Sequence, residues 1–196
     1  MIPNDFNFQY FFFSTYPGYA LQLLPFALLA AILYAVYKNR QIPRDSSPRI
    51  FLSALFVAYF TTLIGLTLLQ SLISNVYYFL FYHVWDSSIW PERQFIYNFI
   101  PNFFRNFNDE RIANIFLFLP FGFLYPQFRQ RSPWFHTLAV GVLTSFAIEF
   151  IQPFVGRSFD VNDLILNAAG LLVGTAIYYS LHALAFRRRV RRNPSK

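Results

Sequence analysis

Long apolar runs constrain this chain more than any other feature of its sequence. Residues 19–37, 50–74 and 164–186 contain no Asp, Glu, Lys or Arg, and residues 134–154 contain one acid, Glu149. A helix needs about 20 mostly apolar residues to cross the hydrocarbon core of a bilayer. Charged residues make up 13% of the chain, against about 25% in soluble domains. The sequence therefore predicts an integral membrane protein.

A fifth apolar segment, residues 112–128, has about the minimum length for a span and contains Pro120 and Pro126. Proline is tolerated in membrane helices, because neighbouring groups can satisfy the carbonyl that it frees. Gly122 beside Pro120 favours a bend at this point. We therefore expect an all-α bundle of about five transmembrane helices, with a re-entrant hairpin at this segment as the competing interpretation.

The basic residues predict the orientation of this bundle. Twelve of the 16 Lys and Arg residues fall on one side of the five predicted spans. By the positive-inside rule this side is cytoplasmic, which places the N-terminus outside and the C-terminus inside. The distribution indicates membrane orientation and lipid-surface anchoring, and it does not predict a nucleic-acid partner. The twelve residues are Lys38, Arg40, Arg44, Arg49, Arg129, Arg131, Arg187, Arg188, Arg189, Arg191, Arg192 and Lys196.

The predicted spans divide the chain into four parts. An N-terminal interfacial segment and two spans occupy residues 1–74, and an extracellular aromatic-rich loop occupies residues 75–111. A three-helix core follows at residues 112–186, before a basic cytoplasmic tail at residues 187–196. The aromatic loop is typical of an interfacial belt, and it could equally form a lid over an outer site.

Scarce polar residues converge on the outer leaflet in this topology. Polar and ionisable groups inside spans are costly and mark functional sites by default. Glu149 and Gln152 are spaced i,i+3, and Asp163 and Asn167 are spaced i,i+4, so each pair shares a helix face. We predict a ligand-binding site from these pairs and their neighbours. The candidate residues are Asn114, Glu149, Gln152, Arg157, Asp160, Asp163 and Asn167.

The same residues also have structural interpretations. Glu149 could pair with Arg157 or Asn114 and simply pin helix ends together. Asp160 could be an N-cap or turn residue, and Asp163 a first-turn acid that is favourable to the helix dipole. Their oxygens suit Mg²⁺ or Ca²⁺, but the ligand spacing matches no known metal site, so we predict no metal and no cofactor.

Small residues predict close helix packing in the last span. Gly170 and Gly174 form a G-x-x-x-G motif on the side that also carries Asn167, and this motif permits close approach of two helices. The partner could be another helix of the chain, and a homodimer through these glycines is left open.

Residues 94–180 resemble the VanZ-like family of small bacterial membrane proteins through four ordered motifs. The motifs are NFIPNF at 98–103, IANIFLFLPFGFLYP at 112–126, SFAIEFIQ at 145–152 and GRSFDVNDLILNAAGLLVG at 156–174. Ala168 departs from the pattern, because related sequences often carry a hydroxyl residue there. The resemblance implies roles for Asn98, Pro101, Asn114, Pro120, Gly122, Glu149, Gln152, Arg157, Asp160, Asp163, Asn167, Gly170 and Gly174.

The family is named for a member associated with resistance to the glycopeptide antibiotic teicoplanin. The resemblance thus implies a multi-pass protein of the bacterial plasma membrane. Its outer-leaflet site would bind a lipid-linked peptidoglycan precursor, another membrane lipid or the acyl tail of a lipoglycopeptide.

An alternative is a membrane enzyme acting on an undecaprenyl-linked or phospholipid substrate, with Glu149 and Asp163 as acid–base groups or metal ligands. A transporter is disfavoured, because the charged residues within the spans are confined to one leaflet.

Overall fold

The computed structural model describes residues 7–41, 47–85, 95–104, 109–129 and 132–192. These residues are mostly helical, apart from one pair of two-residue strands. Their contacts form two compact units, which are described separately below. The N-terminal unit comprises Met1–Tyr97 and Phe150–Phe159, and the C-terminal unit comprises Asn98–Glu149 and Asp160–Lys196.

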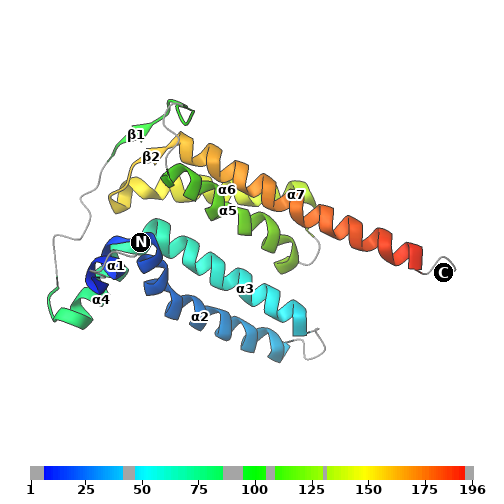
Figure 1. Cartoon of the computed structure of the whole chain (residues 1–196), viewed down its shortest axis with the longest axis horizontal. Helices are drawn as coiled ribbons and strands as arrows, with labels where there is room; N and C mark the ends of the chain where they lie inside the picture. The colour runs from blue at the N-terminus through cyan, green and yellow to red at the C-terminus, as the bar shows by residue number, and fades with distance from the viewer. Residues whose placement is uncertain (1–6, 42–46, 86–94, 105–108, 130–131, 193–196) are drawn as a thin grey trace. The chain divides into compact units, whose positions relative to one another are not determined.

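The N-terminal unit is a set of helices joined by tight breaks (Figure 1). A π-helical turn, η1, interrupts the second long apolar run, and Leu69 at its end leaves helical geometry with φ −115° and ψ 3°. The helical path changes direction there, so α4 does not continue the axis of α3 (Figure 1). The helices are α1 (Phe8–Ser14), α2 (Tyr16–Gln41), α3 (Ser47–Ile64), η1 (Gly65–Leu69) and α4 (Gln70–Tyr82).

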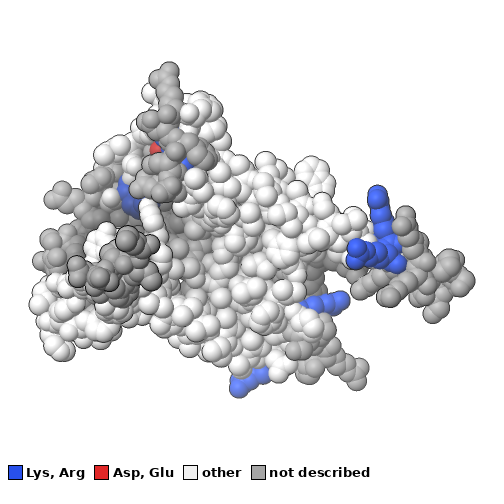
Figure 2. Space-filling view, in the orientation of Figure 1, with Lys and Arg blue, Asp and Glu red and all other residues white. Residues whose placement is uncertain are grey.

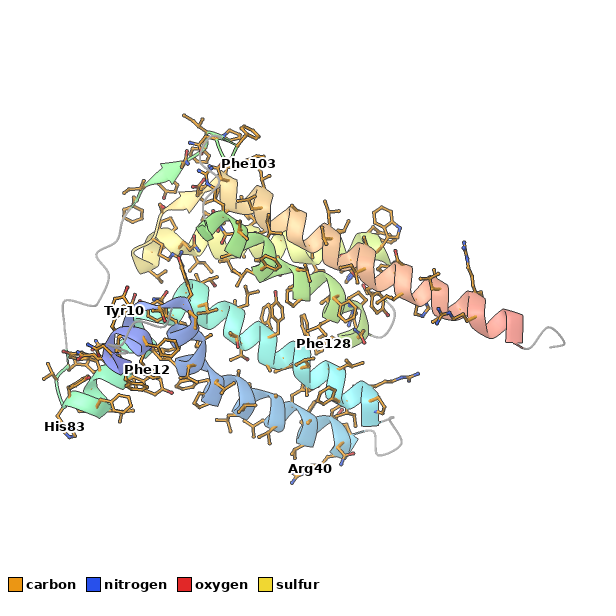
Figure 3. All side chains as sticks on the ribbon, viewed as in Figure 1. Tyr10, Phe12, Arg40, His83, Phe103 and Phe128 are labelled. Carbon is orange, nitrogen blue, oxygen red and sulfur yellow. The ribbon has the colours of Figure 1, made fainter. Side chains whose placement is uncertain are left out.

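A buried glutamine on α2 holds these short elements together. Gln22 is almost completely buried; its amide nitrogen donates to the Phe12 carbonyl at 2.6 Å, and its amide oxygen accepts from the Ser74 hydroxyl at 2.8 Å. The Tyr77 hydroxyl donates to the Gln22 carbonyl at 3.0 Å. The ring of Phe12 packs edge-on against that of Tyr77 and points into the junction of α1, α2 and α4 (Figure 3). This glutamine had no role in the sequence prediction.

The C-terminal unit consists of three helices, α5 (Asp109–Phe128), α6 (Trp134–Ile151) as far as Glu149, and α7 (Val161–Arg192). Contacts between α5 and α7 advance along both helices in the same direction, so the two run parallel. The side-chain contacts of α6 with α7 run in opposite directions along the two helices, so this pair is antiparallel. The start of α5, the end of α6 and the start of α7 therefore lie at the same end of the unit.

Glycines set the distance between α5 and α7. A Cβ atom on Gly170 would lie 2.0 Å from the Ile115 carbonyl oxygen, and one on Gly174 would lie 2.0 Å from the Leu119 carbonyl oxygen. From the other side, a Cβ atom on Gly122 would lie 2.3 Å from the Leu171 carbonyl oxygen. The G-x-x-x-G face is thus covered by α5 of the same chain, and a homodimer would need another surface.

A tight turn connects α6 to α7. A 3₁₀ turn, η3 (Gln152–Val155), follows α6 and ends at Gly156, whose φ of 79° is in the left-handed region that favours glycine. The chain then forms strand β2 (Phe159–Asp160), which pairs with strand β1 (Tyr97–Asn98). This strand pair was absent from the all-α prediction.

The predicted membrane class agrees with the helices. In the described part of the chain, four helices are long and apolar enough to cross a membrane: Tyr16–Gln41, Pro48–Tyr82, Trp134–Val155 and Val161–Arg188. The fifth predicted span, α5, does not belong to this set, although its residues form one helix that does not turn back between Asp109 and Phe128.

Large parts of the visible surface are uncharged (Figure 2). The described arginines at the C-terminal end of α7, Arg187 and Arg188, are exposed and lie beyond the apolar part of the helix. Parts of the predicted segments lie outside the described residues: Arg44, Arg131, Lys196 and residues 1–6, 86–94 and 105–108. The four-part division and the orientation stay predictions.

Substitution of Gly170 or Gly174 by Val should strongly destabilise the C-terminal unit. The added side chain would meet backbone atoms of α5, which cannot move without separating the helices. We expect a loss of at least about 2 kcal/mol, measured as a lower midpoint of thermal unfolding in detergent. Ala176→Val, on the exposed side of α7, is the matched control and should change the midpoint little. Equal effects at all three positions would contradict the proposed packing.

Candidate functional site

The shared end of α5, α6 and α7 carries a dense set of polar side chains. Glu149 lies in the last turn of α6, Asp160 immediately precedes α7, and Asn162 and Asp163 lie in its first turn. Asn114, half-buried, lies in the second turn of α5 at the same end. Four of the predicted site residues, Asn114, Glu149, Asp160 and Asp163, thus lie at this end of the C-terminal unit, whereas Gln152 and Arg157 belong to the N-terminal unit. We refer to this region as the polar end.

Glu149 is a buried carboxylate, with only 2% of its surface exposed. Its Oε2 atom accepts a hydrogen bond from the backbone N–H of Asp160 at 3.2 Å. The bond joins the end of α6 directly to the residue that opens α7. Glu149 therefore has a structural function, and the predicted pairings with Arg157 or Asn114 stay predictions.

Asp160 acts as the N-cap of α7. Its Oδ1 atom accepts from the backbone N–H of Asn162 at 2.8 Å, which is the bond that a capping carboxylate makes with the first helical turn. The same oxygen accepts from the Asn162 side-chain amide at 2.6 Å and from the Asn98 amide at 3.1 Å. The capping interpretation of Asp160 is confirmed. The bond from Asn98 also joins this cap to strand β1.

Asn162 is a residue of this region that the sequence interpretation missed. Its side chain is fully buried, and its Oδ1 atom accepts from the backbone N–H groups of Asn102 at 2.8 Å and Phe103 at 3.0 Å. Its amide nitrogen donates to the Ile100 carbonyl at 3.2 Å as well as to Asp160. One side chain thus fixes the backbone of residues 98–104 against the start of α7, near Phe103 in Figure 3.

Arg111 adds a second attachment for the same segment. Its guanidinium group donates to the Asn102 carbonyl at 3.1 Å and to the Asn102 side-chain oxygen at 3.0 Å. Residues 98–104 are therefore tied to both α5 and α7. Pro101, predicted to be structural, lies exposed in this segment.

Ser145 and Asn167 form a second layer, one helical turn deeper. Asn167 donates from Nδ2 to the Ser145 hydroxyl oxygen at 3.0 Å, and both side chains are buried. Ser145 lies four residues before Glu149 and Asn167 four residues after Asp163, so both follow the polar end inward on their helices. Ser145 was not predicted as a site residue, although the i,i+4 spacing to Glu149 was a usable signal.

The remaining candidates differ in exposure. Asp163 is half-buried in the first turn of α7. Gln152 is buried and belongs to the N-terminal unit, where its carbonyl accepts from the backbone N–H of Arg157 at 3.0 Å. The Arg157 side chain is exposed on this turn. Pro120 is half-buried within α5.

A further polar cluster lies at the opposite end of the C-terminal unit. The Ser132 hydroxyl and the His136 Nδ1 atom are 2.9 Å apart, and the Tyr179 hydroxyl donates to the Ser132 carbonyl. The Tyr125 ring stacks on the His136 ring with 6.0 Å between centroids. These contacts join the loop before α6 to α5 and α7, and sequence spacing did not indicate them.

The chemistry available at the polar end is mainly that of hydrogen-bond acceptors. Within the described ranges, no three acidic, histidine or cysteine side chains are grouped as metal ligands. Carboxylate and amide groups of this kind can orient a polar ligand by accepting its hydrogen bonds.

Comparison with known proteins identifies one family. The family model described as VanZ/LLP1 matches residues 56–184, which is more than half of the chain and includes all four resembling motifs. The match begins within α3 and therefore extends into the N-terminal unit. Neither a curated protein nor a solved structure matches the chain.

Replacing Asn162 by Ala should release residues 98–104 from the start of α7. The change removes an acceptor of two backbone N–H groups and one of the three donors to the Asp160 Oδ1 atom, so a loss of about 2–4 kcal/mol is expected. Hydrogen exchange should speed up at the amides of Asn102 and Phe103. Ser158→Ala, on the exposed turn, is the control. Unchanged exchange in Asn162→Ala would contradict this attachment.

Proposed function

Because this chain belongs to the VanZ/LLP1 family, we propose that it is a non-catalytic protein of the bacterial plasma membrane that lowers susceptibility to teicoplanin-type lipoglycopeptides. In this proposal the polar end of the C-terminal unit lies at the outer leaflet. It binds the head group of a lipid-linked wall precursor, or holds the drug with its acyl tail in the adjacent lipid. Either form of binding reduces productive contact between the drug and the precursor.

The proposal includes five spans, an outer N-terminus and a cytoplasmic C-terminus. The helix α5 supplies the fifth span: its 20 residues measure about 30 Å, and its apolar part, residues 112–128, has about the minimum length for crossing the hydrocarbon core. Its close parallel contact with α7 supports the same depth for both helices. The arginines at the end of α7 then lie on the cytoplasmic side, as the positive-inside rule requires.

The single observation that carries the proposal is the convergence of buried polar groups from α6 and α7 at one end of a hydrophobic bundle. Glu149 is 2% exposed and Asn167 is 3% exposed. Groups of this kind are retained inside membranes where they bind ligands or hold helices. The bonds of Asp160 and Asn162 hold the start of α7 against residues 98–104, whereas the side chain of Asn167 takes no part in this attachment and bonds to Ser145.

The hydrogen bonds favour binding over catalysis. The Asp160 Oδ1 atom is occupied by three donors, and the Glu149 Oε2 atom by a backbone N–H, so both carboxylates orient the fold around the polar end. A general acid or base needs its proton-transferring atom within reach of the substrate. An enzyme acting through the Glu149 Oε2 atom would first have to break the bond that joins α6 to α7.

Susceptibility measurements test this proposal directly. In a strain that depends on this protein for resistance, Glu149→Gln and Asp163→Asn should lower the teicoplanin concentration that the cells tolerate to that of the deletion strain. Purified protein with either change should lose precursor binding. Thr144→Val is the matched control on α6, because its hydroxyl is satisfied by the Val140 carbonyl of its own helix at 2.8 Å.

Two outcomes contradict the proposal. Unchanged susceptibility and binding in both variants would remove the polar end from the function. Chemically altered lipids or precursors in the wild-type strain, absent in the deletion strain, would identify an enzyme instead.

A further inference from the structure

The amide of Asn167 has one atom with a partner and one without. Its Nδ2 atom donates to Ser145, whereas its Oδ1 atom is buried and, among the described residues, has no hydrogen-bond partner. A buried polar atom without a partner lowers stability, and the penalty is severe within a membrane, where no water replaces the missing bond. The unpaired oxygen can therefore accept a hydrogen bond from a donor beyond the described residues.

The position of this oxygen relates it to the acidic residues of the polar end. Asn167 is four residues from Asp163 on α7, and its partner Ser145 is four residues from Glu149 on α6. One helical turn advances about 5.4 Å along the axis. A group bonded to Asn167 therefore lies about one helical turn from Asp163 on α7 and from Glu149 on α6.

The charge of the described side chains at the polar end is negative. Glu149, Asp160 and Asp163 supply three carboxylates, and Arg111 supplies one guanidinium that donates to Asn102. Carboxylates favour a cation over a phosphate as a neighbour. An acceptor oxygen close to them adds a preference for a cation that also carries N–H donors.

We propose that the Asn167 Oδ1 atom accepts a hydrogen bond from the primary ammonium group of a bound ligand, with the neighbouring carboxylates balancing its charge. This proposal rests on the proposed function, since it names the group that the polar end recognises. The ammonium can come from an aminolipid head group or from a side-chain amine of a lipid-linked wall precursor. In both sources the phosphate would remain outside the Ser145–Asn167 layer.

A comparison of two lipids can separate recognition of a positive charge from recognition of N–H donors. Phosphatidylethanolamine and phosphatidylcholine have the same phosphate and both carry a positive nitrogen, but only the ethanolamine nitrogen has N–H donors. We would reconstitute the full chain in nanodiscs with equal amounts of both lipids and phosphatidylglycerol, and quantify the lipids retained after purification. The expected result is at least ~10-fold enrichment of phosphatidylethanolamine over phosphatidylcholine, equivalent to about 1.4 kcal/mol.

Variants assign this preference to Asn167. Asn167→Leu has a similar volume and removes the acceptor, so the enrichment should disappear. Asn167→Asp keeps an acceptor oxygen, so the enrichment of phosphatidylethanolamine should persist. Persistence would also show that a substitution at this position does not by itself prevent folding. Thr175→Val is the matched control, because Thr175 on the same helix also has a buried hydroxyl oxygen without a partner in the described part of the chain. Its enrichment should equal that of the wild type.

A second arm identifies the source of the amine. Binding of the lipid-linked precursor is compared with binding of the same precursor after trimethylation of its side-chain amine, which removes the N–H donors and keeps the charge. Discrimination between these two, lost in Asn167→Leu, supports the proposal with the precursor as source. Lipid enrichment alone supports it with an aminolipid as source.

Other results overturn the inference. Equal retention of the two zwitterionic lipids together with equal binding of both precursors excludes recognition of N–H donors. Discrimination that survives in Asn167→Leu excludes Asn167 as the acceptor. Enrichment of phosphatidylglycerol would mean that the amide presents its nitrogen to an acceptor. If precursor binding nevertheless depends on Glu149 in these cases, the proposed function stands and only the ammonium assignment fails.

Discussion

The close approach of α5 and α7 is the constraint on which the rest of the C-terminal unit depends. Gly170 and Gly174 leave space for carbonyl groups of Ile115 and Leu119 where any side chain would collide. Inside a membrane, association of helices depends on such packing and on hydrogen bonds, because lipid tails are as apolar as the helices. The parallel pair then fixes which helix ends meet, and the antiparallel α6 brings Glu149 to the same end.

The polar residues at this end perform two different tasks. Asp160 accepts a hydrogen bond from a backbone N–H group at the start of α7, and Asn162 holds the backbone of residues 98–104. These bonds use most of the hydrogen-bonding capacity of the two side chains. The layer of Ser145 and Asn167 does not serve this attachment, and it contains an acceptor that the described chain leaves unused. A rigid outer frame around a deeper acceptor is suited to recognition of a polar head group at a defined depth.

The sequence predicted the four described helices that are long and apolar enough to cross a membrane, because each is a long apolar run, but it did not predict α1 or the break at η1. The i,i+4 spacing of Asp163 and Asn167 defines a helix face, and it indicated the polar end. Asn162 was missed since its partners, Ile100, Asn102 and Phe103, are about 60 residues away in the chain, and helical periodicity carries no information on such pairs. Gln22 was missed for the same reason, because its bond to Ser74 depends on the break at η1. The family resemblance predicted the membrane family and the importance of the glycines. It did not predict which polar groups already have hydrogen-bond partners within the fold.

The central claim is that the polar end faces the outside of the cell and the arginine-rich end of α7 faces the cytoplasm. The chain contains no cysteine, so single cysteines can be placed at Phe104, which is 69% exposed, and at Arg188, which is also exposed. A membrane-impermeant maleimide applied to intact cells should label Phe104→Cys and should label Arg188→Cys only after the membrane is opened. Labelling of Arg188→Cys in intact cells, with Phe104→Cys protected, would contradict the account.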